Sequence, residues 1–165
     1  MFRTISDFAE TWTRETEGTL KLFGQLDERS LAQAIAPERR TLGRLAWHIT
    51  TTMREMMGEA KVDVAGPNPD DARPPLPEIV HRYEAAAKAL LDQVRAHWTD
   101  EKLGEAIPMY GEQWTRGAAL ELIVLHQAHH RGQMTVLMRQ AGLKVPGLYG
   151  PAYEEWAAMN MPPQP

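Results

Sequence analysis

The segment from Leu122 to Leu137 constrains the fold most, because histidines interrupt an apolar helical stripe there. At 3.6 residues per turn, His126 and His130 lie one above the other on one helix face. Their neighbours on that face are apolar: Ala119, Leu122, Ile123, Met134 and Leu137. Such a stripe faces a protein core, where each imidazole nitrogen needs a partner. One metal ion bound by both rings would meet that need.

Apolar residues recur at helical spacing in four segments, at about residues 6–26, 42–56, 76–97 and 115–141. Thr41 and Thr115 suit N-cap positions, Pro77 suits a first helical position, and Gly142 is placed to end the last helix. These features predict an all-α four-helix bundle, an architecture whose core often holds metal sites.

Proline and glycine define the connections between the predicted helices. They are frequent in residues 61–75, so we expect a long crossover loop between helices two and three. Residues 105–114 predict an irregular or short extended connection. The Pro-rich tail, residues 145–165, has room for at most one helical turn near Tyr153 to Met159, and we expect it to pack over the bundle.

Size and composition exclude several classes of protein. With 165 residues, the chain 1–165 fits a single domain with a real core. The net charge of -4, from 18 basic and 22 acidic residues mixed along the chain, argues against nucleic-acid binding. Neither a signal peptide nor a membrane helix is evident, so we expect a soluble cytoplasmic protein. Cysteine is absent, so a metal must be held by His, Asp or Glu.

A third metal ligand must come from another helix, because a catalytic site usually has three protein ligands and one open position. His48 is the best candidate, since it lies between Leu45 and Ile49 at the edge of an apolar stripe. His81 and His97 have ordinary explanations near the two ends of the third helix. Glu55, two turns after His48, is a candidate acid or base, although a solvated carboxylate is the more common explanation.

The sequence leaves the second ligand of helix four open. His129 lies three residues after His126 and could replace His130, on a face that is also apolar. Gln133 and Met134 continue the stripe of His130, which favours His130. His129 and Gln133 would then hold a ligand ring by hydrogen bonds, unless His129 contacts a partner chain.

Missing motifs narrow the chemistry. The zinc-protease pattern H-E-x-x-H needs a glutamate after the first histidine, but Gln127 stands there and an amide cannot take a proton from water. No Gly-rich phosphate loop, G-x-S-x-G elbow or di-iron Glu-x-x-His pattern is present.

Three stretches resemble the DinB/YfiT-like family of four-helix-bundle metal proteins: residues 45–49 around His48, the H-x-x-H-H-R-G-Q run that begins at His126, and the G-L-x-x-P-G-x-Y-G-P run that begins at Gly142. The resemblance spans nearly the whole chain. It implies His48, His126 and His130 as ligands, an up-down-down-up bundle and a dimer. Members include bacillithiol S-transferases, a mycothiol-dependent isomerase and proteins induced by stress.

Three functions are compatible with such a site. One divalent ion, with zinc or nickel as first candidates, could activate an external low-molecular-weight thiol for transfer to a small-molecule substrate. It could instead activate water for hydrolysis, or stabilise a non-catalytic stress-response dimer. We rank thiol transfer first, because the chain has no thiol of its own.

Two further expectations concern surfaces. Helix four has apolar residues off its histidine face, which predicts a homodimer contact that includes this helix; they are Val124, Leu125, Ala128, Val136 and Met138. Four aromatic residues are candidates to line a pocket, although each is more often ordinary packing; they are Trp47, Trp114, Tyr110 and Tyr149.

Overall fold

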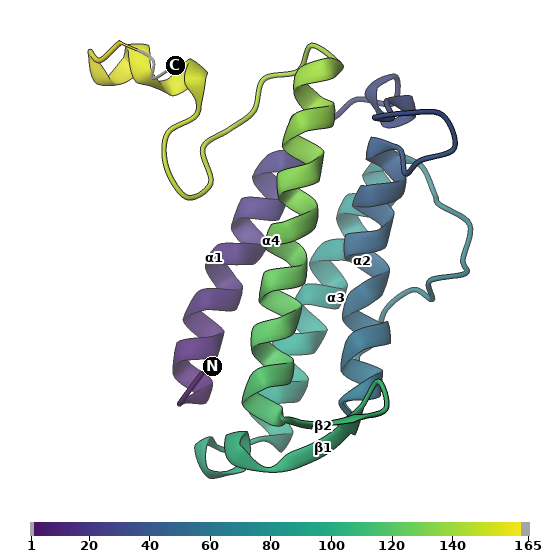
Figure 1. Ribbon diagram of the computed structural model, residues 1–165, viewed down its shortest axis with the longest axis vertical. Helices are drawn as coiled ribbons and strands as arrows, with labels where there is room; N and C mark the ends of the chain where they lie inside the picture. The colour runs from purple at the N-terminus through teal and green to yellow at the C-terminus, as the bar shows by residue number, and fades with distance from the viewer. Residues whose placement is uncertain (1, 163–165) are drawn as a thin grey trace.

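Four long helices form the molecule in a computed structural model that describes residues 2–162 (Figure 1). They are α1 (Ile5–Phe23), α2 (Leu42–Glu59), α3 (Leu76–His97) and α4 (Arg116–Gln140). Figure 1 shows α1 and α4 running in one direction and α2 and α3 in the other. Both α1 and α2 pack against α3 and α4. The all-α four-helix bundle with up-down-down-up order is therefore confirmed.

The connections follow the proline and glycine pattern. A loop over residues 60–75 returns along the side of the bundle from the end of α2 to the start of α3, as predicted (Figure 1). Between α1 and α2 lies a short 3-10 helix, η1 (Ser30–Ala32), and after α3 lies a second, η2 (Asp100–Gly104). The predicted extended connection is a hairpin of β1 (Ala106–Met109) and β2 (Glu112–Thr115), antiparallel with Ile107 opposite Trp114. Tyr110 and Gly111 make its tight turn with positive φ.

Local capping determines the helix ends. The Thr41 and Thr115 side chains accept hydrogen bonds from the backbone N–H groups of Arg44 and Ala118. Gly142 follows α4 with φ of 74°, a left-handed conformation that suits glycine. The first helix ends at Phe23, with Gly24 as its C-cap, and is therefore shorter than predicted. Leu26 is buried as well, but it lies in the turn after the helix. Its apolar character therefore extended the predicted helix too far.

A buried amide ties three helices together in the core. Gln127 of α4 is fully buried. Its Oε1 accepts a hydrogen bond from the Tyr83 hydroxyl of α3 at 3.3 Å, and its Nε2 donates to the backbone carbonyl of Ile49 in α2 at 3.1 Å. These bonds fix how α4 is rotated against its neighbours, because a buried amide without partners would be costly.

Arg131 anchors the start of the C-terminal tail. Its guanidinium is buried, forms an ion pair with Glu15 of α1 and donates to the hydroxyl of Thr19 at 3.0 Å. It also donates to the hydroxyl of Tyr149, which itself donates to the Glu15 carboxylate at 2.7 Å. The first part of the tail is therefore tied to α1 and α4, as expected.

The later tail does not cover the bundle. A third 3-10 helix, η3 (Tyr153–Met159), has no buried residue and stands beside the end of the bundle in Figure 1. Glu154 of η3 forms an ion pair with Arg139 of α4, and Trp156 is half-buried, so this part is tied to the end of the bundle without covering it. Residues 163–165 of the predicted tail lie outside the described residues. None of the described helices has the length and apolar character needed to cross a membrane.

Glu15→Gln tests the buried ion pair. Removing one partner leaves the Arg131 charge buried and uncompensated, which we expect to lower the free energy of unfolding by about 3 kcal/mol. Urea unfolding followed by circular dichroism measures this loss. Glu17→Gln, which neutralises an exposed carboxylate of the same helix, is the matched control. Equal unfolding midpoints for the two variants would show that the pair does not stabilise the fold.

Candidate metal centre

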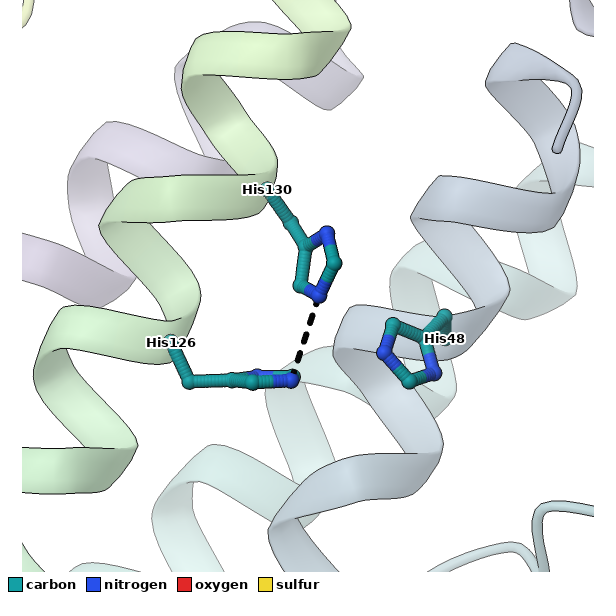
Figure 2. Close-up of side chains that lie close together, drawn as sticks. All are labelled: His48, His126 and His130. Carbon is teal, nitrogen blue, oxygen red and sulfur yellow. Dashed lines mark hydrogen bonds between the residues drawn. The ribbon is translucent and has the colours of Figure 1, made fainter.

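Three histidines from two helices converge between α2 and α4. His126 and His130 project from successive turns of α4, and His48 faces them from α2 (Figure 2). The ring centroids lie 5.1 Å apart for His48 and His126, 4.6 Å for His48 and His130, and 4.4 Å for His126 and His130. The structure thus brings together the three residues that the sequence singled out.

The donor atoms fit one divalent ion. One ring nitrogen from each histidine lies within 4.8 Å of the other two, and Nε2 of His126 lies 3.1 Å from Nε2 of His130. Ligand nitrogens around a tetrahedral zinc ion lie about 3.3 Å apart, given zinc–nitrogen bonds of about 2.0–2.1 Å. Small rotations of the rings would therefore complete the coordination.

Hydrogen bonds determine which nitrogen of His130 points into the site. Nδ1 of His130 lies 2.8 Å from Oε1 of Gln133, and an amide oxygen only accepts, so Nδ1 carries the proton. Nε2 of His130 is then left with a lone pair directed at His126. The amide nitrogen of Gln133 donates to Nε2 of His129 at 3.0 Å. Gln133 therefore orients the ring of His130, and His129 in turn orients Gln133.

His126 is the ring whose hydrogen bonds are incomplete. Its Nδ1 is buried and has no hydrogen-bond partner among the described residues. Its Nε2 faces the Nε2 of His130, which is a hydrogen bond only if His126 supplies the proton. An ion between the rings would instead use both Nε2 lone pairs, so the chemistry of the donor set fits a metal.

Burial keeps all three rings in the neutral form that binds metal. Burial, followed by the Arg40 guanidinium, lowers the pKa of His48 to about 3. Burial, followed by the neighbouring ring of His130, lowers the pKa of His126 to about 4. Burial also lowers the pKa of His130, against the opposing effect of its hydrogen bond to Gln133. At neutral pH no proton needs to leave before a metal ion binds.

A cavity of about 480 Å³ adjoins the histidine group through Gln133, the hydrogen-bond partner of His130. Its apolar wall consists of Ile35, Leu45, Val136 and Leu137, and its polar lining consists of Arg39, Arg40 and Gln133. None of the four aromatic residues proposed from the sequence lines it. Trp47 is fully buried and donates to the backbone carbonyl of Asp71, whereas Tyr110 and Tyr149 are exposed elsewhere. Tyr149 lines a different cavity, together with Arg131 and Leu148, whereas Trp47 serves in packing, the more common explanation.

The comparisons with known proteins agree with this architecture. The model of the DinB family matches residues 1–164. The chain belongs to the DinB family. It is 41% identical over 162 residues to the "Uncharacterized protein YrdA" of Bacillus subtilis (strain 168), covering 98% of this chain and 97% of that protein.

Two solved DinB-like structures share the fold of this DinB chain. A DinB-like protein from Bacillus cereus ATCC 10987 matches with a TM-score of 0.86 and 40% identity, over 90% of this chain and 100% of that one. The DinB-like protein YjoA from Bacillus subtilis matches with a TM-score of 0.68 and 16% identity, over 86% and 97% of the two chains. The second likeness concerns the fold alone.

The remaining sequence candidates of this DinB protein lie outside the group of three rings. His81 and His97 are exposed on α3, as expected, and His129 is exposed on α4. Glu55 is exposed near the hairpin, where it helps to raise the pKa of Tyr110, second to the effect of burial. Among the described residues, no carboxylate joins the three histidines.

Sequence reasoning missed the two arginines of the cavity. Arg39 and Arg40 lie in the loop between α1 and α2, and their place in the cavity lining depends on how that loop folds. The available signal was the adjacent pair directly before the Thr41 cap, eight residues ahead of His48. A basic pair in a loop is usually a solvated surface feature, so the signal is weak.

The lowered pKa values predict acid sensitivity of the metal-free protein. In the unfolded chain the histidines bind protons below pH ~6.5, whereas in the folded protein His48 and His126 bind them only near pH ~3–4. The unfolded state therefore binds more protons within this window, and the folding stability falls as the pH is lowered through it. Each such histidine adds up to about 1.4 kcal/mol per pH unit to the slope. Chemical unfolding at pH 7, 6, 5 and 4 measures it. His48→Asn should flatten the slope and His97→Asn should not; identical slopes would contradict the assignment.

Proposed function

We propose that this DinB-family protein binds one divalent ion, zinc or nickel, through His48, His126 and His130, and transfers an external low-molecular-weight thiol to a small electrophilic substrate. The observation that supports it most is the convergence of three neutral imidazoles beside an open apolar cavity in a chain without cysteine. Three imidazoles leave a coordination position free for a reactant. Both zinc and nickel accept imidazole ligands readily.

The ion would supply Lewis acidity, lowering the pKa of a thiol that coordinates it so that the thiolate is available at neutral pH. The sulfur then forms a bond to the electrophilic carbon of the substrate, and the leaving group departs with its electron pair. The thiol proton passes to solvent through the open side of the cavity. No group of the chain needs to act as a base.

The protein's own residues would bind and orient the reactants. Gln133 holds the His130 ring through Nδ1, so the Nε2 lone pair stays directed at the ion. The apolar wall of the cavity binds the electrophile beside the sulfur and excludes water from it. The site would thus contribute to the reaction in two ways, by positioning the two reactants and by forming the thiolate.

The lack of a carboxylate base in the described histidine group favours a thiol over water as the nucleophile. Hydrolysis usually needs a base for the attacking water, and no carboxylate belongs to the described group. Gln127, which occupies the position of the zinc-protease glutamate, hydrogen bonds into the core and not to the histidine group. A thiol has a pKa of about 8.5 and needs much less help to ionise.

The test loads the protein with zinc or nickel and measures conjugation of a low-molecular-weight thiol to 1-chloro-2,4-dinitrobenzene by absorbance. We expect a rate well above the solution reaction, lost on chelation and reduced at least about 100-fold in His126→Ala, in line with the loss of a metal ligand. His97→Ala, which removes an exposed histidine of α3, should keep metal content and rate.

Other outcomes of this experiment point elsewhere. Ester or amide hydrolysis without thiol, lost on chelation, would replace thiol transfer with hydrolysis. A metal-dependent rise in melting temperature without turnover in either assay would leave a non-catalytic metal-bound protein. Equal metal content in His126→Ala and the native protein would refute the proposed metal site.

We also propose that the protein is a homodimer joined through α4. A stripe at helical spacing is exposed on this helix, formed by Leu125, His129, Gly132 and Val136. Leu125 is 59% exposed and Val136 is 50% exposed. An exposed glycine between them allows a second helix to approach closely. Met138, which the sequence assigned to the same surface, is buried within its own bundle instead.

Leu125→Glu tests the dimer contact. A charge at the most exposed apolar residue of the stripe should convert the dimer to a monomer at micromolar concentration, because an unpaired carboxylate would be desolvated there. Size-exclusion chromatography with light scattering measures the mass. Met159→Glu is the control, since it places the same charge at an exposed apolar residue of η3. A native protein that is already monomeric would refute the proposal.

A further inference from the structure

The cavity beside the histidines combines an apolar wall with two arginines. Its volume of about 480 Å³ lies in the range of small-molecule sites. The wall is formed by Ile35, Leu45, Val136 and Leu137, and the two guanidinium groups belong to Arg39 and Arg40. Gln133 lines the same cavity and hydrogen bonds to His130 at 2.8 Å. A molecule in the cavity therefore lies next to the side chain that orients the ring of His130.

Neither arginine is neutralised by the part of the chain that the structure describes. Arg39 and Arg40 have no ion pair with a described residue, unlike Arg116, Arg131 and Arg139. They are held in place because the loop that carries them is pinned. Ala34 pairs with Thr41 in a β-bridge, and Leu31 packs so closely on Gly43 that an added Cβ would lie 3.0 Å from its Cβ. Both cations are thus presented beside the site by ordered backbone.

Positive charge gathers at the site without a described negative partner. Arg40 acts on all three rings and disfavours positive charge there. Three neutral imidazoles leave a divalent ion with its full charge of two, and no described carboxylate joins the group. The guanidinium groups of Arg39 and Arg40, which are exposed and line the cavity, add two more positive charges to that excess. A negatively charged ligand would relieve the repulsion.

We infer that the cavity binds a small molecule with an apolar body and one anionic group, a carboxylate or a phosphate, which Arg40 and Arg39 recognise. The inference rests on the proposed function, because it names the substrate class of the same centre. Guanidinium groups pair with carboxylate and phosphate through two parallel hydrogen bonds, and the apolar wall holds the rest of the molecule. The anionic group fixes the orientation of the ligand, and the apolar wall provides the contact area that the ligand buries.

The test compares ligands that share an apolar body and differ in charge: 4-phenylbutyrate, 3-phenylpropyl phosphate, 4-phenylbutan-1-ol and 4-phenylbutylamine. Their binding to the full-length, metal-free protein is measured by titration calorimetry or NMR. We expect at least one of the anions to bind about tenfold more tightly than the alcohol, as for a charge-assisted pair, and the amine to bind most weakly. The tighter of the two anions identifies the natural anionic group.

Variants assign the preference to the arginines. Arg40→Gln should reduce the preference for the anion over the alcohol, and the double variant Arg39→Gln with Arg40→Gln should abolish it. Arg95→Gln, which removes an exposed arginine of α3, should leave it unchanged. Val136→Ser should weaken all four ligands by similar factors. Thermal melts check that each variant is folded.

Two results would overturn the inference: equal binding of anions and alcohol by the native protein, or a preference that survives in the double variant. The measurement needs neither metal nor thiol, so it can be separated from the proposed function. If the protein prefers anions but shows no thiol turnover, only the proposed thiol transfer is refuted. If it shows thiol turnover but no preference for anions, only the inferred substrate class is refuted.

Discussion

One buried hydrogen bond determines whether the metal centre can form. The amide of Gln127 donates to the carbonyl of Ile49, and each of these residues directly follows a histidine of the site, His126 in α4 and His48 in α2. The bond therefore fixes the register of the two helices next to the converging rings. A shift of α4 by one residue would turn its side chains by about 100° and separate the donors. The core of the bundle thus sets the geometry of the site.

The site is unusual in its charge. Its three imidazoles are neutral, the charged group that acts on all of them is the Arg40 guanidinium, and the wall of the adjoining cavity is mostly apolar. These properties would favour anions and apolar molecules, and no described carboxylate joins the group as a base for water. An ionisable nucleophile such as a thiol and an anionic substrate both suit this environment. The same physical feature, uncompensated positive charge, supports both proposals.

Periodicity and capping predicted the bundle well, because each depends on residues close in sequence. Thr41, Thr115 and Gly142 mark helix ends that the structure reproduces. The predicted end of α1 was too late because Leu26 is apolar and buried although it lies after the helix, and the sequence pattern does not distinguish the two positions. The tail near η3 was expected on the bundle, but it has no buried residue, and its contact with α4 includes an ion pair between Glu154 and Arg139. Of the four aromatic candidates, Tyr149 lines a cavity, but not the one that contains Gln133, because composition carries no positional information.

The sequence by itself determined that two imidazoles of α4 share a helix face, since the pitch of a helix fixes that relation. It also made His48 the best third candidate, and the family resemblance implied the same trio. Only the tertiary structure decided that the three rings meet, that His129 acts through Gln133, and that Arg40 lies beside them. The reason is physical: local spacing fixes directions within one helix, whereas distances between helices and loops depend on packing across the whole core.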